Sequence, residues 1–170
     1  MTLVRVNKDN LDEYEEFIKK HPKGLFQHSS KWAKVKSAWK FEAIMLKNDS
    51  GEIKGSAAVL IRSIPIIKNS LMYCCRGFVC DENDFDTFDK LFNGLIELGK
   101  EYKAYCIKID PEIVIQNEAY KKHLIEKGFI ELNPGCMDFE NVQPRFVYCF
   151  DYNGMNEDEL MLTFKPDYRN

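Results

Sequence analysis

The apolar positions near the start of the chain predict one short strand and one amphipathic helix. Residues 3–6 have the composition of a strand, and Asn10 is placed to start a helix through a reciprocal capping box with Glu13. The helix ends at residues 21–24, where proline and glycine disfavour a further turn. Its apolar side chains recur at helical spacing, and they are Leu11, Tyr14, Phe17 and Ile18.

Residues 26–36 read Phe-Gln-His-Ser-Ser-Lys-Trp-Ala-Lys-Val-Lys and predict a second, short helix. The hydroxyls of Ser29 and Ser30 stand where the first free amides of this helix need acceptors. Lys36 follows Trp32 by four residues, so it lies at the rim of the apolar stripe. Lys36 is either a cation available to an anion or a solvated lysine whose stem covers the indole ring. The expected apolar stripe is formed by Trp32, Val35 and Trp39.

Apolar runs rich in branched residues predict a three-stranded antiparallel meander in the middle of the chain. Its strands span residues 41–47, 53–67 and 71–75. A long helix over residues 84–100 follows, with acidic residues at its start and Lys100 at its end, as the helix dipole prefers. This is the strongest helical pattern in the chain.

The last third of the chain alternates short apolar runs with helical patterns. The expected strands span residues 104–109, 129–132 and 146–152. Helices are expected over residues 116–127 and from Asn156, which can form a capping box with Glu159. The whole order predicts an α+β domain with a mixed, mostly antiparallel sheet flanked by helices. Because the last helix runs into a charged tail without a stop signal, we expect the sequence to continue in a longer protein.

Composition places the chain among ordinary globular proteins of one domain. It has 170 residues, of which 45% are hydrophobic and 13% aromatic. The net charge of -3 provides no general attraction for nucleic acid. We therefore expect no DNA partner, and any RNA contact requires a local basic patch.

The six cysteines and three histidines do not form a metal-binding pattern. They include no Cys-x-x-Cys pair and no histidine at ligand spacing, so we expect no metal site. Several cysteines lie in apolar runs, where a thiol packs as a small hydrophobe, and the N-terminus lacks the features of a secretory signal. We therefore expect a reduced, cytoplasmic protein. No apolar run is long enough to cross a bilayer, which leaves membrane contact peripheral at most.

Several common catalytic and nucleotide-binding signatures are absent from the sequence. It contains no GxSxG, GxxxxGKS/T, GxGxxG or HExxH pattern. A coenzyme A pyrophosphate is expected to be held by a glycine-rich turn that enters a helix, but the turn at Arg76-Gly77 carries one glycine. We therefore do not expect a coenzyme A site in this domain.

Polar residues at strand ends and in loops remain as candidates for function. The candidates are Lys36, Tyr73, Arg76, Asp110, Gln143 and Arg145. Asp110 is either a general base or a turn residue that accepts local amides. Arg76 either binds an anion or pairs with the acidic residues between positions 81 and 86. Residues 143–145 are most simply a loop that leads into an edge strand. Taken singly, these residues do not decide a function.

Five motifs in a fixed order give these residues a context. They are residues 26–36, Tyr73-Cys74-Cys75-Arg76-Gly77, Lys108-Ile109-Asp110-Pro111, Gln143-Pro144-Arg145 and residues 164–170. In this order they resemble the N-terminal domain of the Fem family. This family comprises the FemA, FemB, FemX and MurM aminoacyltransferases, which build the interpeptide bridges of peptidoglycan. The resemblance extends over nearly the whole chain.

The resemblance implies the fold of the N-acetyltransferases, the GNAT fold, with residues 1–152 as the first of two such domains. Residues 153–170 would then begin the segment that leads into the second domain. The implied activity is transfer of an amino acid from its tRNA ester to an amine of the peptidoglycan stem peptide, in cell-wall synthesis. The implied acceptor is a UDP-MurNAc-peptide or lipid II. Aminoacyl-tRNA is the co-substrate, and no further cofactor is implied.

The resemblance also implies roles for individual residues. Lys36 matches the family lysine that follows a tryptophan, here Trp32, and contacts the diphosphate of the nucleotide sugar. The other expected substrate-binding residues are Tyr73, Arg76 and Arg145. Asp110 matches a family aspartate whose role lies between shaping the groove and assisting proton removal. No other catalytic residue is assigned.

The implied reaction sets an expectation for the activity of this chain alone. Attack of an amine on an ester needs two large substrates in position and a stabilised oxyanion, and in the family these groups come largely from the second domain. We therefore expect this chain to bind weakly and to turn over little, with most aminoacyl-tRNA contacts in the second domain. Two alternatives stay open: an acetyl-CoA-dependent GNAT N-acetyltransferase and a non-catalytic GNAT-like binding module.

Overall fold

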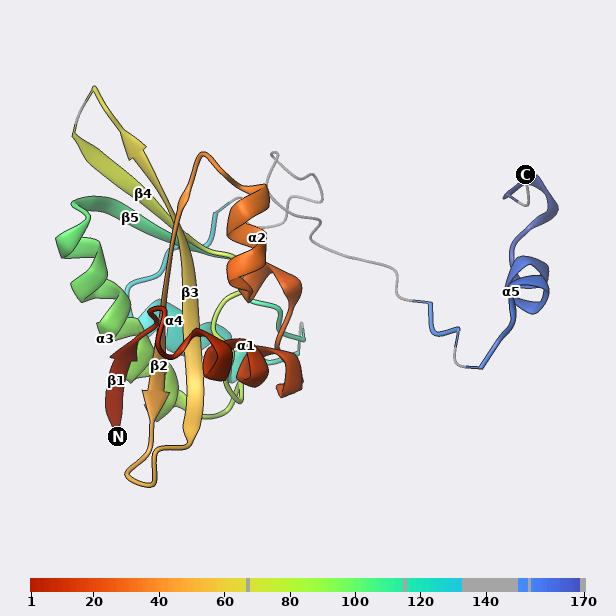
Figure 1. Ribbon diagram of the computed structural model, residues 1–170, viewed down its shortest axis with the longest axis horizontal. Helices are drawn as coiled ribbons and strands as arrows, with labels where there is room; N and C mark the ends of the chain where they lie inside the picture. The colour runs from red at the N-terminus through yellow and green to blue at the C-terminus, as the bar shows by residue number, and fades with distance from the viewer. Residues whose placement is uncertain (67, 115, 133–149, 153, 169–170) are drawn as a thin grey trace. The chain divides into compact units, whose positions relative to one another are not determined.

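The chain forms two compact units, residues 1–130 and residues 131–170, and each is described by itself. The larger unit is built around one β-sheet (Figure 1) and carries the candidate site. The structure, a computed structural model, describes residues 1–66, 68–114, 116–132, 150–152 and 154–168.

The sheet has five strands in the order β1-β2-β3-β4-β5. The pairs β1–β2, β2–β3 and β3–β4 are antiparallel, and β5 runs parallel to β4. The predicted mixed, mostly antiparallel sheet is therefore confirmed. The strands are β1 (Thr2–Arg5), β2 (Lys40–Lys47), β3 (Ile53–Ile64), β4 (Asn69–Cys74) and β5 (Ala104–Ile109).

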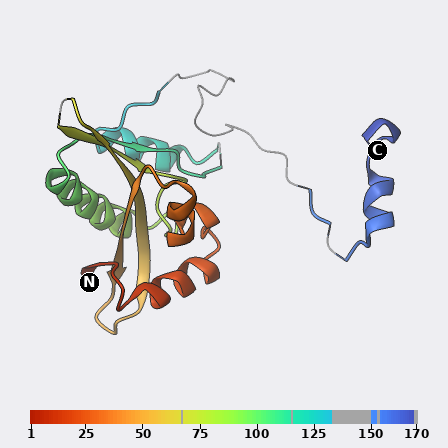
Figure 2. The same ribbon diagram turned by 45° about the horizontal axis from the view of Figure 1, so that its top comes forward.

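Helices cover both faces of this sheet (Figures 1 and 2). The helices are α1 (Leu11–Lys20), α2 (Ser30–Val35), α3 (Phe85–Glu101) and α4 (Glu118–Glu126), with a short 3-10 helix, η1 (Phe26–His28). α3 packs on one face through Phe88, Leu91 and Leu95, and α4 joins the same core. α1 packs on the opposite face through Tyr14 and Ile18, as its predicted stripe requires. The middle of β3 is therefore buried on both sides, whereas β4 alternates between buried and half-buried residues.

The long helix α3 confirms its prediction in position and in polarity. The carboxylate of Asp84 caps it, accepting hydrogen bonds from the main-chain amide of Thr87 at 3.0 Å and from its hydroxyl at 2.7 Å. Gly94 lets the helix approach the sheet closely, because a Cβ at this position would lie 2.6 Å from Cδ1 of Ile44.

The short helix α2 begins as predicted but does not bury an apolar stripe. Ser29 Oγ accepts a hydrogen bond from the amide of Lys31 at 3.1 Å, which confirms the expected cap. The helix ends at Val35, whose side chain is 68% exposed, and Trp39 lies beyond it. The predicted stripe is therefore wrong: six residues make fewer than two turns, too short for a face to bury.

The predicted capping box between Asn10 and Glu13 is also wrong, because both side chains have other partners. Oδ1 of Asn10 accepts a hydrogen bond from the amide of Asn7 at 2.8 Å, and its amide donates to the carbonyl of Arg5 at 3.1 Å. The carboxylate of Glu13 pairs with Lys47 at 2.6 Å. Contacts to β1 and β2 thus replace the local cap.

The predicted strand over residues 129–132 is wrong as well. The chain leaves α4 through Gly128, whose φ is +85°, and the ring of Phe129 then packs beside Phe92 with centroids 4.8 Å apart. Phe129 is the residue of this run that packs, because Ile130 is 85% exposed and Leu132 is 64% exposed. Residues 150–152 are not in a strand either, and residues 146–149 of that expected strand lie outside the described residues.

The smaller unit contains a helix, α5 (Glu157–Thr163), and a 3-10 helix, η2 (Pro166–Tyr168). The capping box predicted for α5 is confirmed. Oδ1 of Asn156 accepts from the amide of Glu159, and the carboxylate of Glu159 accepts from the amide of Asn156, both at 3.0 Å. None of the described helices is both long and apolar enough to cross a lipid bilayer.

Candidate functional site

The candidate site lies where the parallel strands β4 and β5 end. Beyond Cys74 the chain turns sharply, with φ of +60° at Arg76 and +76° at Gly77. The turn is fixed to β5, because the main-chain amide of Arg76 donates a hydrogen bond to Oδ1 of Asp110 at 2.7 Å. A Cβ on Gly77 would lie 2.9 Å from Cβ of Pro111, so glycine is required for both its conformation and its space.

Asp110 and Tyr73 each bury a polar atom at this turn. Burial raises the pKa of Asp110 above its usual value, although the amide of Arg76 works against this shift. Burial also raises the pKa of Tyr73, and the neighbouring Cys75 and Asp110 raise it further. Oδ2 of Asp110 and Oη of Tyr73 have no hydrogen-bond partner among the described residues. Two neighbouring buried polar atoms at this turn therefore lack a well-formed hydrogen bond within the described residues.

His28 reaches the same turn from η1. Its side chain is 1% exposed, and its Nδ1 accepts a hydrogen bond from the amide of Leu25 at 3.1 Å. The proton of the neutral ring is therefore on Nε2, which has no hydrogen-bond partner among the described residues. Burial lowers the pKa of His28 to about 4, against an opposing effect of the main-chain carbonyls of Gly77 and Cys75. His28 is thus neutral at physiological pH.

Lys36 and Trp32 form a separate contact at the end of α2. Lys36 is the residue that follows the last turn, and its Nζ lies 5.2 Å from the centroid of the Trp32 ring. The ring of Phe26 packs edge-on against Trp32 with centroids 5.1 Å apart. This position fits both interpretations of Lys36: its stem covers the indole, and its exposed ammonium group is free to meet an anion.

Strand register adds two cations to the face that Tyr73 occupies. Tyr73 pairs with Leu60 on β3 and with Lys108 on β5, so the half-buried Lys108 projects from the same face. Arg62, two residues beyond Leu60, also projects from this face, and its guanidinium lies 5.7 Å from the centroid of the Trp39 ring. Sequence reasoning assigned no role to Arg62, Lys108 or His28. The sequence signal that could have indicated Arg62 is its charge within the apolar strand β3, two residues after Leu60 and therefore on the same face.

Arg76 does not pair with the acidic residues that follow it. Its side chain forms no ion pair with any described residue, and its Nε is buried without a partner among them. Lys23 occupies that role instead: its Nζ donates to Glu82 at 2.8 Å and to the carbonyl of Glu112 at 2.7 Å. The pairing interpretation of Arg76 is therefore wrong, and its interpretation as an anion ligand stays open. Arg145, with the rest of residues 143–145, lies outside the described residues.

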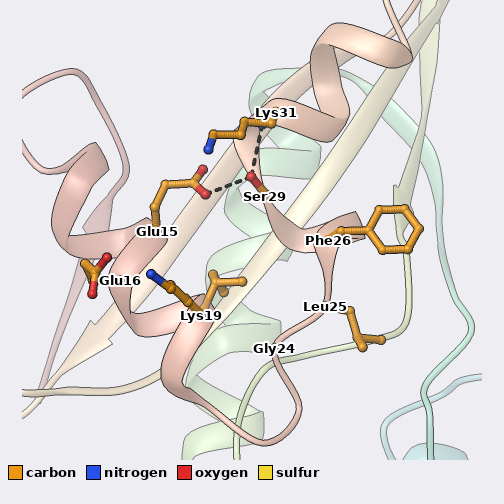
Figure 3. Close-up of a pocket in the computed structure, with 9 residues that line it drawn as sticks. Glu15, Glu16, Lys19, Gly24, Leu25, Phe26, Ser29 and Lys31 are labelled. Carbon is orange, nitrogen blue, oxygen red and sulfur yellow. Dashed lines mark hydrogen bonds between the residues drawn. The ribbon is translucent and has the colours of Figure 1, made fainter. Parts of the chain in front are cut away.

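A cavity with walls from α1 and the start of α2 lies elsewhere and does not include the predicted residues. It has a volume of about 340 Å³ and is bordered by α1 and the start of α2 (Figure 3). Glu15 lies on its wall and accepts hydrogen bonds from Ser29 Oγ at 2.7 Å and from the amide of Ser30 at 2.8 Å. These bonds hold α2 against α1. Since the polar groups of Glu15 are already engaged, we assign this cavity no ligand.

The entrance to α3 is unfavourable for a pyrophosphate. Asp84 caps the helix with its carboxylate, so the first free amides already have an anionic acceptor. Asp81, Glu82 and Asp86 add negative charge nearby. Among the described residues no three metal-ligating side chains gather at one point.

Comparison with known proteins places this chain in a family. The FemAB family model matches residues 10–170. Two curated relatives are both named lipid II:glycine glycyltransferase. The protein of Staphylococcus epidermidis is 32% identical over 158 residues, and that of Staphylococcus aureus is 30% identical over 161 residues. Each comparison covers 90% of this chain and 37% of the relative, so the chain spans about 37% of the length of the curated relatives it matches.

Solved structures confirm the GNAT-like fold. A crystal structure of FemX is 30% identical, with a TM-score of 0.66 over 75% of this chain and 32% of that chain. An aminoglycoside acetyltransferase from an uncultured soil sample has a TM-score of 0.60 over 82% of this chain and 98% of that chain, but at 18% identity it shows the fold alone. Together with the family match over residues 10–170, these relationships show that the chain belongs to the FemAB family.

Proposed function

We propose that this chain is the acceptor-binding part of an aminoacyltransferase that extends the stem peptide of a peptidoglycan precursor. The observation that carries the proposal is the group of buried, unpartnered polar atoms on Tyr73, Arg76 and Asp110 at the ends of β4 and β5. In a chain of the FemAB family, such a group at the carboxyl ends of two strands is a suitable binding site for a polar ligand. The names of the curated relatives support lipid II as one acceptor.

The acceptor would be held through its diphosphate and its peptide. Lys36, Arg62 and Lys108 are cations that form no ion pair with any described residue, and a diphosphate supplies the anion they lack. UDP-MurNAc-peptide and lipid II share this diphosphate, so the same cations suit both acceptors. Trp32 would keep Lys36 extended, and Arg76 and Arg145 would complete the binding surface.

Asp110 is the candidate to assist the chemistry. In the transfer, the acceptor amine forms a bond to the ester carbonyl carbon, the bond from that carbon to the tRNA ribose oxygen breaks, and the amine loses a proton. A carboxylate whose pKa is raised by burial is a better proton acceptor than an ordinary aspartate, and Oδ2 of Asp110 is unoccupied by other described groups. The alternative role is to shape the groove by holding the Arg76 turn.

The remaining requirements would be met outside residues 1–152. A second domain, which residues 153–170 would lead into, would bind most of the aminoacyl-tRNA and stabilise the oxyanion. Aminoacyl-tRNA is then the only co-substrate, with no further cofactor and no DNA partner. Because charged tRNA is made and used in the cytoplasm, the proposal also places the protein there.

The binding part of the proposal is tested by titrating this chain with UDP-MurNAc-pentapeptide in a calorimeter. We expect Lys36→Ala to weaken binding by about tenfold, because a cation facing a diphosphate is lost. Lys34→Ala removes an exposed lysine from the same helix and is expected to leave the affinity unchanged. Equal affinities of the Lys36 variant and the unmodified chain would remove Lys36 from the site.

The choice between acyl donors is tested by thermal unfolding with added acetyl-CoA. A ligand that binds the folded state raises the melting temperature, so an acetyl-CoA-dependent enzyme would show a concentration-dependent increase. We expect no increase, since Asp84 already caps α3. A clear increase would support the acetyltransferase alternative and contradict the aminoacyl-tRNA-dependent reaction.

A further inference from the structure

One end of the sheet carries exposed cations and apolar side chains together. Lys40 at the start of β2 pairs with Ile61, so β3 continues past β2 and forms a projecting hairpin with β4 (Figure 1). The loop from α2 into β2 lies at this same end, and the contact between Arg62 and Trp39 joins it to the hairpin. We call residues 34–40 with the described residues of 62–69 the basic end.

The apolar part of the basic end is unusually exposed. Ile66 at the tip of the hairpin is 94% exposed, the highest value among the exposed large apolar side chains, and Val35 is 68% exposed. Pro65 is also exposed. Burying an isoleucine side chain lowers the free energy, and at a hairpin tip this burial requires the surface of another molecule.

The charge of the basic end has one sign. The sequence has no acidic residue between positions 29 and 41 or between positions 53 and 80. Within the described chain, Lys34, Arg62 and Lys68 form no ion pair. The whole chain has a net charge of -3, so this local excess of cations is opposite to the overall balance. Such a surface is complementary to an extended layer of negative charge.

We propose that the basic end docks on a lipid bilayer that contains anionic lipids. Ile66 enters the boundary of the acyl chains, and Lys68 beside it contacts the headgroup phosphates. Trp39 suits the interface, where an indole has one apolar and one polar side. RNA would satisfy the cations but has no apolar layer to bury Ile66, which favours a membrane.

This docking goes beyond the proposed transfer reaction and does not depend on it. It would hold the face of Tyr73 and Lys108 near the membrane, where a lipid-linked acceptor resides. A small apolar contact combined with several cations predicts weak binding that falls as salt screens the charges.

The test is sedimentation of this chain with vesicles of equimolar phosphatidylglycerol and phosphatidylcholine. We expect the chain to sediment with these vesicles at low salt, to remain free with vesicles of phosphatidylcholine alone, and to be released at high salt. Ile66→Ser is expected to weaken binding by about fivefold, and Lys68→Glu by at least about tenfold. Both side chains are exposed, so the circular dichroism spectrum should be unchanged.

Val114→Ser is the matched control, because Val114 is 59% exposed but follows β5 at the opposite end of the sheet. It is expected to bind like the unmodified chain. Equal binding by the Ile66 and Val114 variants, or equal binding to both kinds of vesicle, would overturn the proposal. A chain that ignores vesicles but binds uncharged tRNA, with that affinity reduced by Lys68→Glu, would identify an RNA surface and would overturn it as well.

Discussion

The main-chain amide of Arg76 donates a 2.7 Å hydrogen bond to Oδ1 of Asp110, and this bond joins the end of β4 to the end of β5. Parallel strands are joined by a long crossover, so this side chain adds a direct link between two ends that no turn connects. The two carboxylate oxygens of Asp110 therefore differ in their hydrogen bonding. Oδ1 holds the turn, and Oδ2 remains free of partners among the described residues.

The first prediction separates these two oxygens. Asp110→Asn keeps an acceptor for the Arg76 amide, so the free energy of unfolding should stay at or above that of the unmodified chain. Asp110→Ala removes the acceptor and leaves a partly buried amide unpaired, which should cost about 1–2 kcal/mol. Urea unfolding measures both. Similar losses in the two variants would show that the charge, not the hydrogen bond, stabilises the turn.

Gly77 offers a second prediction about the same turn. Gly77→Ala places a Cβ 2.9 Å from Pro111 and strains a residue with φ of +76°, so we expect a loss of about 2–3 kcal/mol in unfolding free energy. Gly51→Ala is the control, because Gly51 has φ of +87° but open space around it. Its loss should be about 1 kcal/mol. Equal losses would mean that the Pro111 contact relaxes without cost.

The buried histidine predicts how stability depends on pH. The pKa of His28 is about 4 in the folded chain and its ordinary value is 6.5, so between these values the unfolded chain binds more protons. Stability should therefore fall as the pH drops from 6.5 towards 4, and the full contribution is about 3 kcal/mol.

Urea unfolding between about pH 5 and pH 7 tests this dependence. Against the opposing effect of burial, hydrogen bonds from Arg5, Tyr102 and Lys40 lower the pKa of Glu42 to about 2, so the contribution of this carboxylate to stability is lost only below its ordinary pKa of 4.5, outside the window. His28→Gln should flatten the profile in this window. His21→Gln is the control, because His21 is less buried and its pKa is lowered less. An unchanged slope in the His28 variant would contradict its assignment as a neutral, buried ring.

The hydroxyl groups of Tyr14 and Tyr73 are both buried, but they differ in their partners, which predicts different effects of the same substitution. Tyr14 Oη donates a 2.5 Å hydrogen bond to the carbonyl of His28, so Tyr14→Phe should cost about 1–2 kcal/mol. Tyr73 Oη has no partner among the described residues, so Tyr73→Phe should leave the free energy of unfolding unchanged or raise it by about 1 kcal/mol. If both variants lose similar stability, the Tyr73 hydroxyl has a partner in the folded chain.

The sequence by itself determined the elements whose side-chain pattern is long enough to be unambiguous. The seventeen residues of α3 repeat apolar positions over several turns. β5 is a short apolar run that ends at Asp110-Pro111, and both elements were predictable to within a residue or two. The motifs around Lys36, Arg76 and Asp110 also indicated the family before any coordinates, because their order along the chain is independent of the packing.

Tertiary structure alone decided which residues meet. Strand register placed Lys108 beside Tyr73, and a one-residue shift would have moved it to the other face. The exposure of Val35 and the burial of His28 depend on which distant segments pack over them. The local sequence of residues 26–36 does not contain this information. A short apolar run such as residues 129–132 was ambiguous for the same reason. Its composition suits a strand, but in the fold Phe129 packs against Phe92 while Ile130 and Leu132 are exposed, and no strand forms.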